Sequence, residues 1–243
     1  MTMKILNKLL ILVTGLLLSG CVTTTTKGQE FPRMYGELRP ASILMLPPIN
    51  KTTAADATEL YAATTPVPFT QHGYYFLPPA VVFDLLKQDG IYDTESILTT
   101  PPQVIGKKFG VDALLFVEIT HWNTQYYIVG GTVSVGVNLK LVSSVTGETI
   151  WQRYSLLVTD TSGGNNSGGG LAGLLIKAVA AAIQTASTDY VPIARQNNQI
   201  ALMALPYGKR HQRYNQDQAD AFQPVERPAA NPPTTNEADK AAQ

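Results

Sequence analysis

Residues 111–119 read Val-Asp-Ala-Leu-Leu-Phe-Val-Glu-Ile, and residues 113–117 carry no polar side chain. A short run without polar residues is typical of a strand that is covered on both faces of a sheet. Residues 132–142 and 149–160 instead alternate or carry β-branched residues, and a turn at 145–148 separates them. With a short strand expected at 126–129, they predict an antiparallel meander that follows the buried strand.

The chain before and after this stretch supplies helices and further strands. Upstream, strands are expected at 41–46 and 74–77, and helices at 54–63, 80–88 and 100–109. Downstream, a glycine-rich loop at 162–170 leads to helices expected at 171–187 and 192–205. The order predicts an α/β domain with a mixed sheet that contains the meander and is packed by helices.

The first twenty residues have the pattern of an export signal. A basic start and the apolar stretch 9–18 lead to Leu18-Ser19-Gly20, directly before Cys21, the only cysteine. This arrangement resembles the signal peptide and lipobox of bacterial lipoproteins. The apolar stretch is about half the length that a membrane-spanning helix needs, and one cysteine excludes a disulfide within the chain.

The lipobox resemblance implies a lipid anchor. In that class of protein the leader 1–20 is removed, and the thiol and new amino terminus of Cys21 carry acyl chains such as palmitate. Several acyl chains anchor a protein stably, so we expect Cys21 to attach the chain to a membrane. The residue after the cysteine is Val22 rather than aspartate, which favours delivery to the outer membrane, facing the periplasm.

The ends of the mature chain look different from its middle. Residues 21–36, with a threonine run and no periodicity, predict a lipidated tether, and residues 37–208 predict the periplasmic α/β domain. Residues 209–243 are polar with repeated proline and alanine, and predict a disordered tail. Without the leader the formal charge is −2, which gives no reason to expect nucleic-acid binding.

Residue types that carry catalysis or bind metals do not form a known pattern. The three histidines lack metal-ligand spacing, and the glycine-rich loop lacks the Gly-Lys-Ser/Thr ending of a phosphate loop. Glu118 interrupts the buried strand, so we expect it at a sheet edge or paired with a cation such as Arg153. His121 follows Glu118 by an odd spacing, which predicts that the two lie on opposite faces of a strand.

The sequence therefore predicts no catalytic, cofactor-binding or metal-binding residue and no enzyme activity. The alternative is a periplasmic hydrolase or sugar-binding enzyme, for which Asp112, Glu118 and Glu148 are the only plausible carboxylates. A structure that separates these three side chains would remove this alternative.

Residues 171–183 are apolar on nearly every face of the expected helix. Such a helix is normally buried in a core. Alternatively, one face forms an interface with a partner or a second copy, for which Leu171, Leu174, Ala178 and Ala182 are the candidates.

Several motifs together resemble one family of bacterial lipoproteins, which includes a genome-derived neisserial antigen. They are the lipobox, Leu46-Pro47-Pro48-Ile49-Asn50, Tyr75-Phe76-Leu77-Pro78-Pro79, Gly110-Val111-Asp112-Ala113 and the glycine-rich loop. The resemblance implies a fold similar to the periplasmic domain of curli-secretion-channel lipoproteins and no established enzymatic activity. It also implies a binding or assembly module of an envelope secretion or assembly complex, whose partners would be envelope proteins such as a curli-channel-like lipoprotein.

Overall fold

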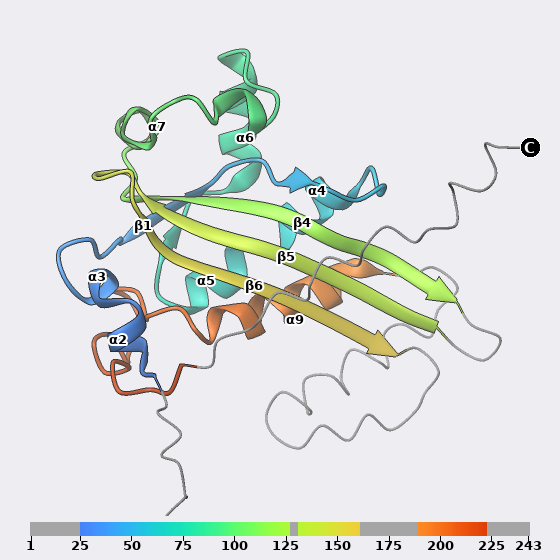
Figure 1. Cartoon of the computed structure of the whole chain (residues 1–243). Coiled ribbons are helices and arrows are strands. Elements are labelled where there is room, and N and C mark those ends of the chain that lie inside the picture. The colour runs from blue at the N-terminus through green and yellow to red at the C-terminus, as the bar shows by residue number, and fades with distance from the viewer. Residues whose placement is uncertain (1–24, 127–130, 161–188, 223–243) are drawn as a thin grey trace, which may run out of the picture.

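The strands of the computed structural model form one six-stranded mixed sheet within the residues that it describes, 25–126, 131–160 and 189–222 (Figure 1). The strand order is β3-β1-β4-β5-β6, with β2 beside β4. Pairs among the first four strands are parallel, and β4, β5 and β6 form the antiparallel meander. The strands are β1 (Ser42–Met45), β2 (Ile49–Asn50), β3 (Tyr75–Phe76), β4 (Ala113–Tyr126), β5 (Gly131–Ser143) and β6 (Thr149–Asp160). The predicted mixed α/β fold is confirmed.

Helices cover both faces of the sheet. In Figure 1, α6 and α7 lie on one side of the long strands, and α5 and α9 lie on the other. The larger core lies under α4, α5 and α9, and a smaller one lies under α6 and α7. The helices of this layer structure are α4 (Ala57–Thr64), α5 (Pro66–Gln71), α6 (Pro79–Gln88), the short 3-10 helix η1 (Glu95–Ile97), α7 (Pro102–Phe109) and α9 (Tyr190–Leu202).

The alternating pattern of β5 fixes which of its faces is buried. Five alternate residues have 0 % exposure: Val133, Val135, Val137, Leu139 and Leu141. Because successive side chains point to opposite faces, these five lie on the face that α9 covers. A register shift of one residue would expose the whole row, so the pattern itself specifies the pairing.

The structure differs from the prediction at the end of the buried strand. We expected one strand to end at residue 119 and another to begin at residue 126. Instead β4 runs continuously through both positions, because the register shift between Ile119 and His121 accommodates one extra residue, Thr120. A β-bulge of this kind keeps two strands paired across a break in the alternation. Residues 127–130 lie outside the described residues.

Local signals set the helix ends. Proline occupies the first position of α6 and α7, and Gly110 ends α7 with a φ of 65°, a left-handed conformation that glycine adopts without strain. The last helix begins two residues earlier than expected, because the Asp189 side chain accepts a hydrogen bond from the Val191 N–H at 3.0 Å. The expected helix at 171–187 lies outside the described residues. None of the described helices is both long and apolar enough to cross a membrane.

Candidate functional site

The segment 21–36 was expected to be a tether, but its described part, residues 25–36, is folded. Thr26 and Gln29 form a capping box that starts α2 (Lys27–Glu30), and α3 (Pro32–Tyr35) follows directly. Phe31 and Met34 are buried, at 7 % and 3 % exposure. Two apolar side chains in a short polar segment give no periodic signal, yet they are enough to dock it on the core.

The segment 209–222, expected to begin a disordered tail, is folded against this first segment. The ring centroids of Phe31 and Phe222 lie 5.3 Å apart, edge to face. Three backbone hydrogen bonds join the segments: Lys27 N–H to the Asp220 carbonyl at 2.9 Å, Gly28 N–H to the Gln218 carbonyl at 2.9 Å, and Phe222 N–H to the Thr25 carbonyl at 2.7 Å. Residues 223–243 lie outside the described residues.

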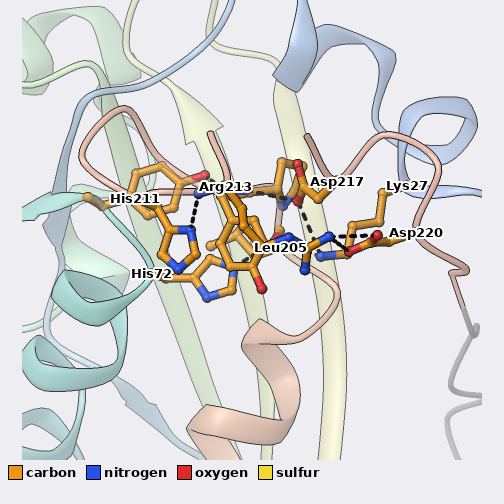
Figure 2. Close-up of polar contacts among 10 residues, drawn as sticks. Lys27, His72, Leu205, His211, Arg213, Asp217 and Asp220 are labelled. Carbon is orange, nitrogen blue, oxygen red and sulfur yellow. Dashed lines mark hydrogen bonds and ion pairs between the residues drawn. The ribbon is translucent and has the colours of Figure 1, made fainter. Parts of the chain in front are cut away.

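A buried ion pair lies between these two segments (Figure 2). Lys27 Nζ is 3.3 Å from Asp217 Oδ2, and the two side chains are 5 % and 0 % exposed. Lys27 Nζ also donates to the Leu205 carbonyl at 3.4 Å, and Asp217 Oδ2 accepts from the Tyr207 N–H at 3.1 Å. We call Lys27, Asp217, Leu205 and Tyr207 the terminal clamp, because they join the two ends of the described chain.

The terminal clamp is costly to bury. Burial lowers the pKa of Lys27, and the adjacent Asp217 opposes that shift. Among the described residues, the second carboxylate oxygen of Asp217 and the neighbouring Tyr35 hydroxyl are buried without a well-formed hydrogen bond. Burial raises the pKa of Tyr35, and its proximity to the Asp217 carboxylate raises it further. An ion pair in such surroundings is stable only while both partners are present.

Aromatic rings surround the clamp. The rings of Tyr207 and His211 stack with centroids 3.7 Å apart and planes within 2°. The Lys27 ammonium lies 5.0 Å from the Tyr207 centroid, and the Arg213 guanidinium lies 5.3 Å from it. Arg213 also makes two hydrogen bonds to Asp220, at 2.9 and 3.0 Å. Tyr207 thus lies within cation–π distance of both cations.

His72 links the clamp to the edge of the sheet. Its Nε2 donates to the Leu205 carbonyl at 2.7 Å, the same carbonyl that Lys27 contacts. Burial lowers the pKa of His72 to about 4, and the positive charges of Lys27 and His211 act in the same direction. At neutral pH the imidazole is therefore uncharged and acts as a hydrogen-bond donor.

Two glycines, Gly73 and Gly208, allow the loop before β3 and the segment 208–211 to approach closely beside His72. Gly73 has a φ of 91°, and a Cβ there would lie 2.5 Å from the His211 nitrogen. A Cβ on Gly208 would lie 2.4 Å from the Gly73 carbonyl oxygen. Hydrogen bonds from the Gly208 N–H to the His72 carbonyl (2.9 Å) and from the Arg210 N–H to the Gly73 carbonyl (3.1 Å) close this contact. The last described segment is thus fixed to the loop before β3.

The three carboxylates of the alternative enzyme do not converge. Asp112 Oδ2 accepts three hydrogen bonds, from the Ala41 N–H and from the N–H and hydroxyl of Ser42, at 2.8–3.0 Å. Exposed Glu148 pairs with Arg33. Glu118 lies six residues beyond Asp112 along the chain, which is about 20 Å in a strand. Glu118 is therefore too far from Asp112 for the three carboxylates to share one site.

The structure contradicts the expected surroundings of Glu118 and the expected strand face of His121. Glu118 lies opposite Asn138 and accepts its side-chain N–H at 2.6 Å, whereas Arg153 lies opposite Leu139, on the other face. Of the two alternatives for Glu118, the pair with Arg153 is therefore wrong, and so is the sheet edge, because β4 lies between β1 and β5. His121 lies opposite Gly136, two residues from Asn138, so the bulge places it on the same face as Glu118. Side chains alternate between the two faces of a regular strand, and the one extra residue of a β-bulge reverses that alternation.

Within the described ranges, no group of three or more His, Cys, Asp or Glu residues is arranged to hold a metal ion. Cys21 and the interface candidates Leu171, Leu174, Ala178 and Ala182 lie outside these ranges, and remain predictions. The sequence reasoning missed the terminal clamp. The signal that was available is the spacing of Tyr207, His211 and Tyr214, which places a ring every three or four residues from the end of the expected domain into the segment taken to be disordered.

Comparison with known proteins places the chain in a group of lipoproteins. Residues 33–207 match the model of the family described as "Putative lipoprotein GNA1162-like". The clamp residues Lys27 and Asp217 both lie beyond this range. The chain is 34% identical over 155 residues to "Putative lipoprotein NMB1124/NMB1162" of Neisseria meningitidis serogroup B, an alignment that covers 64% of this chain and 71% of the relative.

Two solved structures are among the similar ones. The crystal structure of lipoprotein GNA1162 from Neisseria meningitidis is 34% identical, with a TM-score of 0.49, covering 59% of this chain and 98% of that one. A PelC dodecamer from Paraburkholderia phytofirmans is 12% identical, with a TM-score of 0.43, covering 70% of this chain and 90% of that one.

Proposed function

The chain belongs to the GNA1162-like family of lipoproteins, and from this membership we propose that it is a lipid-anchored protein of the cell envelope. The anchor is the acylated Cys21, exposed when the leader 1–20 is removed. The lipobox Leu18-Ser19-Gly20-Cys21 supports this assignment, because the modification needs a thiol preceded by small residues. Attachment through several acyl chains holds such a protein stably on a bilayer.

We also propose in which membrane and compartment the protein works. The protein is held on the outer membrane, faces the periplasm, and acts there as a binding or assembly module of an envelope secretion or assembly complex. Val22 in place of aspartate after the cysteine supports the outer membrane. The distance of Glu118 from Asp112, and the separate partners of Asp112, Glu118 and Glu148, support a binding role over the hydrolase alternative.

The terminal clamp is the observation that carries this proposal. Lys27 follows Cys21 by only six residues, which span at most about 20 Å when fully extended. Because Lys27 is docked by Asp217 and by backbone hydrogen bonds, the folded domain begins no further than that from an acylated Cys21. A module held this close to the bilayer is suited to partners that are themselves in or on the membrane.

Fractionation and cross-linking of the envelope test the proposal. The full chain is followed through a density gradient that separates the two membranes, and its neighbours are cross-linked before solubilisation in detergent. We expect the protein in the outer-membrane fraction, with cross-links to membrane-bound partners. Recovery in the inner-membrane or soluble fraction would contradict the localisation.

An insertion variant tests the short distance directly. About twenty glycine and serine residues placed between Thr23 and Thr24 add roughly 25 Å of average reach and leave the anchor and the clamp intact. We expect the cross-links to weaken. The same insertion after Ala230 is the matched control and should leave them unchanged. Equal cross-linking in both variants would exclude a role for the short distance.

A further inference from the structure

An apolar groove lies at the edge of the sheet, between α4 and α6. Its volume is about 470 Å³, and Phe76 of the edge strand β3 lines it together with residues of both helices. Ala62 and Phe76 are nearly buried at 5 % and 7 % exposure. Phe83 and Pro79 of α6 continue the apolar lining. A groove of this size, with an apolar floor and few polar groups, is typical of a binding site.

The backbone of β3 is open on this edge. Tyr75 and Leu77 donate their N–H groups to β1, to the carbonyls of Ala41 at 2.9 Å and Ile43 at 3.0 Å. In a parallel pair, alternate residues direct both backbone groups to opposite sides, so the N–H and C=O of Phe76 point away from β1. Within the described residues β3 pairs with β1 alone, and neither backbone group of Phe76 has a hydrogen-bond partner there.

The rims of the groove are charged. Glu59 of α4 and Asp84 and Lys87 of α6 are exposed side chains that line it. These three give a net charge of −1. Of the ion pairs that the described residues form, none involves Glu59, Asp84 or Lys87. The two carboxylates are therefore available to a cationic ligand.

We propose that this groove binds an extended peptide segment of a partner protein, which pairs with the Phe76 backbone, inserts an apolar side chain and places a lysine or arginine near Glu59 and Asp84. An added strand satisfies the backbone groups that an acyl chain or a helix would leave unpaired. The net negative rim favours a cationic over an acidic peptide. The inference deepens the proposed binding module by naming the chemistry of its partner.

Three synthetic ten-residue peptides serve as probes for the full chain purified in detergent. One alternates valine and lysine, one alternates valine and glutamate, and the third is the lysine peptide with N-methylated alternate backbone nitrogens, which cannot pair as a strand. Affinity is measured by fluorescence anisotropy. We expect the glutamate peptide to bind about tenfold more weakly than the lysine peptide, and the N-methylated peptide to lose binding. Equal affinity for all three would overturn the proposal.

Hydrogen exchange locates the site. In the free protein the backbone amide of Phe76 should exchange rapidly, and the lysine peptide should slow the exchange of the segment 73–77. Protection elsewhere without protection here would overturn the assignment to β3.

Two arginine substitutions separate the groove from the surrounding surface. Ala63→Arg fills the groove from an exposed position on α4, and Ala55→Arg places the same side chain at an exposed position that does not line it. We expect Ala63→Arg alone to abolish binding of the lysine peptide. Equal binding by the two variants would overturn the site. A negative peptide result would leave lipidation and membrane location untouched, so the failure of this inference and of the proposed function are distinguishable.

Discussion

At the level of single residues, Lys27 and Asp217 show how one buried ion pair can join two segments that are far apart in the sequence. Lys27 lies six residues after Cys21, and Asp217 lies in a segment that looks disordered by composition. The backbone hydrogen bonds form only while segments 25–36 and 209–222 lie side by side, and the buried ion pair holds the two segments together. The stability of this arrangement depends on both charges, because either one alone would be buried without a counterion.

Replacing Lys27 with methionine should therefore destabilise the protein strongly. Asp217 would keep its negative charge at 0 % exposure and lose the ammonium group that neutralises it, while the Tyr207 N–H remains in place. Losing one member of a buried pair costs about 3–5 kcal/mol, which urea unfolding measures. Adding Asp217→Asn should recover part of that loss. Arg213→Gln, which breaks the exposed pair with Asp220, is the control and should cost much less; equal losses for the two single variants would refute the clamp.

His72 should make stability depend on pH. Burial lowers its folded-state pKa to about 4, while the unfolded imidazole titrates near 6.5. As the pH falls below 6.5 the unfolded chain takes up a proton that the folded chain does not bind, so stability is fully present above 6.5 and is lost towards pH 4. Between pH 7 and pH 5 this amounts to about 2 kcal/mol. His72→Gln should lack this component, and identical pH profiles for the two proteins would show that His72 is not the group responsible.

At the scale of elements, sequence patterns located most helices and strands but not the bulge. The apolar row of β5 and the proline starts of α6 and α7 follow directly from side-chain and backbone geometry. The continuity of β4 does not, because one extra residue at Thr120 reverses the alternation and mimics a strand end. For the same reason the shared face of Glu118 and His121 could not be predicted. The clamp was missed because its partners are separated by 190 residues and neither carries a periodic signal.

The packing of α7 on the turn that follows β5 depends on one glycine. A Cβ on Gly106 would lie 2.2 Å from the Ser144 Cβ, a distance that side-chain rotation cannot relieve. Gly106→Ala should therefore destabilise the protein by about 1–2 kcal/mol, even though alanine favours a helix. In a Ser144→Gly background the same change should be neutral or stabilising. A double-mutant cycle with denaturant unfolding measures this coupling; an equal cost in both backgrounds would mean that the contact does not limit the packing.

At the scale of the whole molecule, the folded unit extends beyond the limits that composition indicated. Ending the chain after Gly208 removes Asp217, the His211 ring and Phe222, and should lower the melting temperature by about 10 °C. Ending it after Phe222 keeps these contacts and should change the melting temperature little, since residues 223–243 are polar and without periodicity. Thermal unfolding followed by circular dichroism compares the two truncations. Equal melting temperatures would contradict this prediction and would mean that residues 209–222 do not stabilise the domain.

We propose that a lipid on Cys21 places this folded domain directly on a membrane. Metabolic labelling with an alkyne fatty acid, followed by mass spectrometry of the amino-terminal fragment, tests it most directly. We expect label on the parent protein and a mature chain that begins at acylated Cys21, and neither label nor leader cleavage before residue 21 in Cys21→Ser. Undiminished label on Cys21→Ser, or a parent chain that retains residues 1–20 without a lipid, would contradict it.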